Sequence, residues 1–264
     1  EKAIAAAKSL GYKIHPVNIN TSSRHWEVKD KTLHSPLSSI KGLGSAAMDQ
    51  IINNRPFNTA EEFLFHPDVT YSKLNKKALD VLFRAGACQH LVDERFAGDK
   101  HFWSAAIVDR PKTKKKFRDN IELYKAEGDF TKHEIISNKT SLTGVYPFEM
   151  IMDDELRERL SALSVVPISE YETALSMGGD WNVDDVLLVW FVPRSLKKKK
   201  TARGAEYWIL EVIDENNIMT RIRCWGPKKE DKIETNQPYM ARIDFNSQWG
   251  FSTRSISKNF RKIS

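Results

Sequence analysis

Apolar and polar residues follow two different periods along this chain, and the change of period divides it into two parts. Before about residue 180, apolar residues recur with the spacing of amphipathic helices, and Gly residues separate the runs. From Val183 onward the apolar residues fall in short extended runs. Residues 1–10 predict a helix that stops at Gly11, and residues 12–34 predict short extended pieces. The order of the two parts predicts an α+β protein whose helical module comes first.

The second part contains five candidate strands that are rich in Val, Ile, Trp, Tyr and Phe and are separated by turn or charged residues. Five strands within roughly 80 residues are typical of a small antiparallel barrel or sandwich. The predicted strands are Val186–Pro193, Glu206–Ile213, Ile218–Trp225, Tyr239–Phe245 and Trp249–Ser257.

The stretch Leu37–Met48 predicts a short helix, a Gly-x-Gly turn and a second helix that begins at about Ser45 and runs through Asn54. Gly42 and Gly44 can both adopt positive φ and allow another backbone to approach closely. We expect the inner face of this hairpin to consist of Ile40, Leu43, Ala47 and Ile51.

The start of the second helix in this hairpin has the chemistry of an anion site. Its first N–H groups have no partner within the helix, and its dipole places partial positive charge there. Lys41 adds a full charge beside it. A site of this kind binds the phosphate backbone and does not read bases. The alternative is an ordinary Gly-capped connection between two helices. The predicted phosphate-binding residues are Lys41, Gly42, Leu43, Gly44, Ser45 and Ala46.

A second, degenerate hairpin follows the first. It consists of Ala60–Phe65 and then Asn75–Ala87. A single hairpin buries little apolar surface, so a pair is expected to pack as one compact unit. This predicts a tandem helix-hairpin-helix module over residues 36–92. Whether the second hairpin contacts DNA or only supports the first is left open by its residues.

One predicted strand has a face that suits single-stranded nucleic acid. Along Ile218–Trp225, Ile222 and Cys224 would face the core, whereas Arg221, Arg223 and Trp225 would face outward. Tyr207, on the neighbouring strand, would extend this outer face. Cations beside aromatic rings are the arrangement that follows a phosphate backbone and stacks on bases. A register slip of one residue would exchange the two faces.

A basic segment, residues 194–204, is expected to form the loop between the first two strands. Its candidate DNA contacts are Lys197, Lys198, Lys199, Lys200 and Arg203. Phosphates would supply the counter-charge for this run and release bound cations. A solvated charge run and a contact with a protein partner are the alternatives. The run from Arg110 to Arg118 is a second basic patch with the same two alternatives, DNA contact or solvated charge.

Composition limits the other classes of function. The chain has 264 residues, enough for two domains, and a net charge of +6 that favours a polyanionic partner. Its two cysteines, Cys88 and Cys224, form no CxxC pair and fit a cytoplasmic, reducing compartment. No apolar run approaches the ~18 residues of a membrane span. No metal-ligand spacing, phosphate-binding loop or nucleophile motif is present, so we expect no catalytic residues, metal or cofactor in this segment.

Several segments together resemble a known family. They are Asn18–Ser22, Ile40–Gly44, Phe57–Phe63, Leu82–Ala87 with Arg95, Ser141–Tyr146, and the strand region Val186–Ile256. In this order they are similar to the region after the fingers of bacterial DNA polymerase III alpha subunits. The resemblance covers most of the chain.

The resemblance implies an OB-fold, a five-stranded β-barrel, over residues 181–264. Residues 1–35 would be a connecting segment after the fingers, and residues 93–180 a helical and mixed linker. The family implies nucleotidyl transfer with Mg²⁺ held by carboxylates of a palm domain, which would precede Glu1. The segment would therefore be a non-catalytic, sequence-independent DNA-binding region of a bacterial or phage replicative polymerase, binding duplex and single-stranded DNA.

The chain also departs from the family. Pro147–Met150 stands where the family has a Ser-x-His-Pro sequence, and no sliding-clamp pentapeptide surrounds any of the Gln residues. We expect a monomer, with replisome proteins as a further class of partner. Two alternatives remain open: a free-standing repair or recombination DNA-binding protein, and an OB-fold adaptor that docks replisome proteins.

Overall fold

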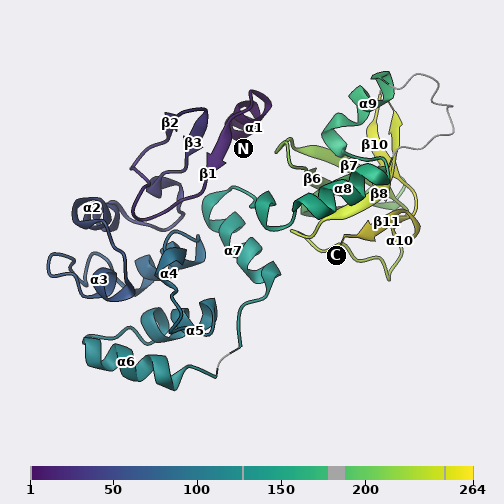
Figure 1. Cartoon of the computed structure of the whole chain (residues 1–264). Helices are drawn as coiled ribbons and strands as arrows, with labels where there is room; N and C mark the ends of the chain where they lie inside the picture. Colours follow the sequence, from purple (N-terminus) through teal and green to yellow (C-terminus); the bar gives the residue numbers. More distant parts are fainter. Residues whose placement is uncertain (1, 127, 178–187, 247, 264) are drawn as a thin grey trace. The chain divides into compact units, whose positions relative to one another are not determined.

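A computed structural model describes residues 2–126, 128–177, 188–246 and 248–263. The chain divides into two compact units (Figure 1). One is the helical unit, Leu10–Pro147, and the other, the barrel unit, combines Glu1–Ser9 with Phe148–Ser264. The predicted α+β class is confirmed, since helices dominate the first unit and strands the second.

The helical unit begins with a small three-stranded sheet in the order β1-β3-β2 and continues with short helices. Asp30 and Lys31 both have positive φ, which closes the two-residue turn between β2 and β3. The elements are β1 (Lys13–His15), β2 (Glu27–Lys29), β3 (Thr32–His34), η1 (Leu37–Ser39), α2 (Ser45–Asn54), α3 (Ala60–Leu64), α4 (Lys76–Arg84), η2 (Gln89–Leu91), α5 (Asp99–Trp103), η3 (Ser104–Val108), α6 (Lys114–Leu123) and α7 (Lys132–Thr143).

A single apolar core joins the helices of this unit. It includes the whole predicted inner face of the first hairpin, because Ile40, Leu43, Ala47 and Ile51 are all buried. Phe57 belongs to the same core and packs edge-on against Phe63 with ring centroids 5.0 Å apart. The two hairpins therefore share one core, as expected of a pair that is too small to fold separately.

The barrel unit is built around a curled mixed sheet. Helices α8 and α9 both contact β4, which pairs parallel with β5. The elements are α1 (Lys2–Ser9), η4 (Phe148–Met150), α8 (Asp154–Ala162), β4 (Val165–Pro167), η5 (Ile168–Glu170), α9 (Tyr171–Met177), β5 (Leu188–Lys200), β6 (Glu206–Ile213), β7 (Thr220–Trp225), β8 (Tyr239–Arg242), β9 (Asp244–Asn246), β10 (Gly250–Thr253), α10 (Ile256–Asn259) and β11 (Phe260–Lys262).

The pairing of the strands is that of an OB-fold. β5, β6 and β7 form an antiparallel meander, β10 pairs parallel with β7, and β9 pairs antiparallel with β10. β8 returns to pair antiparallel with β5, and only the buried Ile243 separates β8 from β9. Taken as one bent strand, β8 and β9 close the sheet into a five-stranded Greek-key barrel.

Three features of the barrel differ from the prediction. The expected strand Trp249–Ser257 spans only Gly250–Thr253, and its last residues, Ile256 and Ser257, begin helix α10. The expected strand Tyr239–Phe245 is bent at Ile243 into β8 and β9. The first strand extends to Lys200, seven residues beyond its predicted end at Pro193, and its register shifts between Pro193 and Ser195. Val186, the predicted start of that strand, lies outside the described residues. The extension follows from pairing, because β6 offers a partner for every residue from Ser195 to Lys200.

Candidate nucleic-acid interface

The Gly42–Gly44 turn connects η1 to α2 in the helical unit. Gly42 has φ +88°, a conformation that favours glycine. Gly44 differs from the prediction, because its φ of −76° and ψ of 155° are extended values open to any residue. The left-handed step that turns the chain therefore occurs once, at Gly42. The first predicted helix is also short, a single 3-10 turn at Leu37–Ser39.

Gly44 is the N-cap of α2, and the start of that helix is open. The N–H groups of Ala47 and Met48 both donate to the carbonyl of Gly44, at 3.1 Å. Within the described residues, the N–H groups of Gly44, Ser45 and Ala46 donate to no protein acceptor, and no side chain caps the helix. All three residues are exposed. Free donors at the positive end of a helix form a site that fits an anion.

The space in front of these donors is also open. A Cβ atom placed on Gly44 would meet no heavy atom within 4 Å. Lys41, just before the turn, is exposed as well. Its own N–H donates to the carbonyl of Leu142 at 2.9 Å, which ties the turn to the end of α7. The turn is thus anchored to the end of α7, and the side with the free N–H groups faces solvent.

A residue that the prediction did not single out holds the hairpins together. The side-chain amide of Asn20 donates to the carbonyl of Phe57 and accepts from the N–H of Phe57, both at 2.8 Å. The neighbouring Ile19 N–H donates to the carbonyl of Ala87 at 2.8 Å. These bonds bridge the segments before α3 and after α4. The resemblance in Asn18–Ser22 was the only sequence signal for Asn20, and it gave no partner.

The second hairpin repeats the burial pattern of the first. Leu74 and Ala78 are buried, and they correspond to the buried Leu43 and Ala47. Asn75–Lys77, between them, are exposed, as Gly44–Ala46 are. Here the cap is closed, because the Asn75 side chain accepts from the N–H of Ala78 at 3.0 Å. The second hairpin therefore offers exposed lysines at its helix start, whereas the first offers unpaired backbone donors.

The outer face of the barrel has the predicted alternation. In β7, Ile222 and Cys224 are buried, whereas Arg221 and Trp225 are exposed. Across the strands the register aligns Lys199, Tyr207 and Trp225 in one row, Lys197, Ile209 and Arg223 in the next, and Ser195, Glu211 and Arg221 in the third.

Tyr207 and Trp225 form an aromatic pair on this face. Their rings stack with centroids 4.9 Å apart and planes 29° apart. Trp225 is 38% exposed. A rigid, partly exposed ring pair is a surface on which bases can stack. Arg223, in the adjacent row, is held by a hydrogen bond from its guanidinium to the carbonyl of Trp249.

The lysine run is on a strand, not in a loop as predicted. Lys197–Lys200 are the last four residues of β5, and the turn to β6 lies at Thr201–Ala205. Because strand residues alternate, Lys197 and Lys199 share the outer face with Tyr207. Lys198 and Lys200 point the other way, and Lys198 lies 5.2 Å from the ring centroid of Trp208. Arg203 is exposed in the turn.

One carboxylate balances part of the outer face. Glu211 accepts from the Ser195 hydroxyl at 2.7 Å and forms ion pairs with Lys197 and Arg221, both at 3.3 Å. The Ser195 hydrogen bond and the Lys197 contact hold the pKa of Glu211 below its usual value. The aromatic end of the face thus carries the less compensated cations, Lys199 and Arg223.

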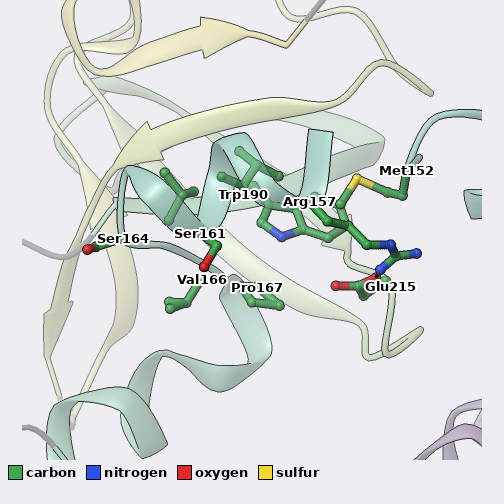
Figure 2. Close-up of a pocket in the computed structure, with 10 residues that line it drawn as sticks. Met152, Arg157, Ser161, Ser164, Val166, Pro167, Trp190 and Glu215 are labelled. Carbon is green, nitrogen blue, oxygen red and sulfur yellow. Dashed lines mark hydrogen bonds and ion pairs between the residues drawn. The ribbon is translucent and has the colours of Figure 1, made fainter. Parts of the chain in front are cut away.

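A pocket of about 210 Å³ lies between α8, β4 and β5 (Figure 2). Trp190 forms part of its wall, and at one side the Arg157 guanidinium meets the Glu215 carboxylate. Its charged groups pair with each other and its other walls are largely apolar, so we assign it no chemistry.

Metal chemistry does not fit the described residues. They contain no group of three or more His, Cys, Asp or Glu side chains placed to hold a metal ion. The carboxylate-held ions implied by the resemblance therefore have no ligand set here, and no step of nucleotidyl transfer is derived from this chain. None of the helices in the described ranges is long and apolar enough to cross a membrane.

Comparison with known proteins agrees with this arrangement. A family model described as a helix-hairpin-helix motif matches residues 11–97, which contain both hairpins and the Asn18–Ser22 segment. The DNA polymerase III alpha subunit of Chlamydia pneumoniae is 29% identical over 197 residues, which is 65% of this chain. The chain is similar in sequence to DNA polymerase III alpha subunits over most of its length.

Further relatives extend over more of the chain. The error-prone DNA polymerase of Corynebacterium glutamicum is 27% identical over 238 residues, 85% of this chain and 20% of the relative. The alpha subunit of Xylella fastidiosa is 32% identical over 94 residues, 34% of this chain. The chain spans 15% of the Chlamydia pneumoniae alpha subunit, so it corresponds to a small portion of these polymerases.

Proposed function

We propose that the chain is a sequence-independent DNA-binding region of a replicative DNA polymerase of the polymerase III alpha type. The observation that carries the proposal is the open start of α2, where the N–H groups of Gly44, Ser45 and Ala46 are exposed without an acceptor. Backbone donors at a helix start bind a phosphate whatever base it carries. The hairpin would bind duplex DNA through the phosphate backbone of the DNA, and Lys41 would add a positive charge beside the helix start.

The barrel would bind the single-stranded template. Tyr207 and Trp225 would stack on bases, and Lys199 and Arg223 would lie beside the phosphates. Lys197 and Arg221 share Glu211, so we expect each to contribute less. Lys198, Lys200 and Arg203 would contact the strand at the tip of the β5–β6 hairpin. Catalysis, with its Mg²⁺, would belong to other parts of the polymerase.

Fluorescence anisotropy with single-stranded, duplex and primer–template DNA of unrelated sequences tests this function. We expect sequence-blind binding, strongest on primer–template, that weakens steeply as salt rises. Gly44→Val should weaken duplex binding more than single-strand binding, because its side chain would enter the open space before α2. Trp225→Ala should do the opposite.

Two results would overturn the proposal. Binding that depends on one DNA sequence would contradict recognition through the backbone. No binding to any of the three DNAs, even at low salt, would remove the DNA-binding role and favour a barrel that docks protein partners. Thermal unfolding of each variant confirms that any lost affinity is not lost folding.

A further inference from the structure

A second part of the barrel wall gathers cations around a pocket. The pocket has a volume of about 230 Å³ and lies on β8, α10, β11 and the start of β5. It is not on the β6–β7 face that carries Tyr207 and Trp225. The residues that matter to its chemistry are Leu188, Met240, Ala241, Arg242, Lys258 and Arg261.

The strand register places the side chains of Leu188, Met240, Arg242 and Arg261 on one surface, whereas Ala241 is buried on the core face. Leu188 is opposite Arg242 across β5 and β8, and Met240 is opposite Arg261 across β8 and β11. The alternate residues of these strands, among them Val189 and Phe260, are buried in the barrel core. The pocket therefore has an apolar floor on the outer wall, with cations around it.

Several cations on the barrel are paired with carboxylates, and the cations of this pocket are not among them. Lys197 and Arg221 share Glu211, Lys200 pairs with Glu206, and Lys262 pairs with Glu234. In the described part of the chain, no carboxylate forms an ion pair with any of the three cations that line the pocket, and no carboxylate lines it. Like charges that line one pocket repel one another, and an anion bound there would relieve that repulsion.

One of the three is also held in place. The Nη1 group of Arg261 donates to the carbonyls of Ser257 at 2.9 Å and Phe260 at 3.0 Å. These bonds fix the guanidinium without neutralising it. A charged planar fork that is already oriented loses less freedom when it binds an oxyanion.

We propose that this pocket binds the sugar–phosphate backbone of DNA, as a contact surface separate from the hairpin and from the Tyr207–Trp225 face. Arg242, Lys258 and Arg261 would contact phosphates, and Leu188 and Met240 would pack against a deoxyribose. Among the described residues that line the pocket there is no aromatic ring, so the contact would not involve stacking on a base. The inference rests on the proposed DNA-binding function and adds a place on the barrel that a strand can follow.

The test compares two triple variants with the same loss of charge. The first is Arg242→Gln, Lys258→Gln and Arg261→Gln. The control replaces three exposed lysines of the β7–β8 connection, Lys228, Lys229 and Lys232, with Gln. Binding of single-stranded DNA is measured by anisotropy over a range of salt. Loss of three phosphate contacts should lower the slope of log affinity against log salt by about 2. The control should keep the wild-type slope.

A double variant keeps Arg261, so that loss of its hydrogen bonds to the carbonyls of Ser257 and Phe260 cannot affect folding. The double variant Arg242→Gln with Lys258→Gln should show about two thirds of the slope change of the triple variant, with an unchanged thermal midpoint. If the wild type binds DNA and the pocket variants match the control, the pocket inference is wrong and the proposed function stands. If the wild type binds no DNA, both fail.

An acidic peptide would be a different ligand for the same cations. A peptide of alternating Asp and Leu, added to wild type and to the triple variant, distinguishes the two. If the peptide binds only the wild type while DNA binding is the same in both, the pocket belongs to a protein partner and the proposal is overturned.

Discussion

The two hairpins suggest a substitution that should separate DNA binding from stability. Gly44 leaves the start of α2 uncapped, whereas Asn75 caps α4 with its side chain. Gly44 has φ −76° and ψ 155°, close to the −75° and 176° of Asn75, and a Cβ at Gly44 meets nothing within 4 Å. Gly44→Asn should therefore introduce into the first hairpin the cap that the second one has.

The expected changes have opposite signs. An Asn at an N-cap stabilises a helix by a few tenths of a kcal/mol relative to Gly, so the thermal midpoint should rise by about 1 °C. The same side chain would occupy the place of a phosphate. Hydrogen bonds to a charged group contribute about 1.5–3 kcal/mol, so affinity for duplex DNA should fall roughly 10- to 150-fold.

Anisotropy on a duplex and thermal unfolding of the same samples measure both effects. Gly128→Asn, at an exposed loop glycine, is the matched control and should change neither. Gly42→Ala is the contrasting variant. Its positive φ should cost about 1–2 kcal/mol of stability and weaken binding as well. Wild-type affinity of Gly44→Asn would refute the reasoning, because it would mean that phosphates do not approach the start of α2.

Three further predictions follow from the geometry. Trp225→Ala should weaken the binding of single-stranded DNA by about 1–3 kcal/mol for each base that stacks on Trp225. An unchanged affinity would exclude stacking there. Hydrogen bonds from Arg95 lower the pKa of Glu61 below its ordinary 4.5, so their stabilisation is present at neutral pH and lost as pH falls through the lowered value. The unfolding free energies of wild type and Glu61→Gln should therefore converge in acid; a constant difference would contradict this. Burial raises the pKa of Cys88 and raises that of Cys224 to about 12, so a thiol reagent should label both only after unfolding, and rapid labelling of the native protein would contradict their burial.

Features set by local periodicity could be predicted from the sequence. The start of α2 at Ser45 follows from the glycines and the helical run after them, and the structure confirms it. The buried and exposed faces of β7 follow from strict alternation, and Ile222 and Cys224 are buried as expected. Both depend only on residues close in sequence, where the helical and strand periods are strong signals.

Features set by distant partners could not be predicted in this way. Lys197–Lys200 have a composition typical of a loop, but β6 pairs with them and supplies Glu206, Trp208 and Glu211 as neighbours. Asn20 has its role only because Phe57 lies beside it, 37 residues away in sequence. The pocket at Arg242 was missed for the same reason, since α10 and β11 bring its other cations there.

The proposed sites use two kinds of donor, and this difference has a consequence for binding. The hairpin offers backbone N–H groups, which bind a phosphate without neutralising it, and Lys41 is the one full charge placed beside them in the turn. The barrel offers Lys and Arg side chains, which displace the counterions of the DNA. Salt dependence reports counterion release, so it should come mainly from the barrel. Gly44→Asn should then lower affinity by a similar factor at every salt concentration, whereas removing Arg242 and its neighbours should change the slope. A hairpin variant that altered the slope as much as a barrel variant would mean that the hairpin lysine, and not its open helix start, carries the phosphate contact.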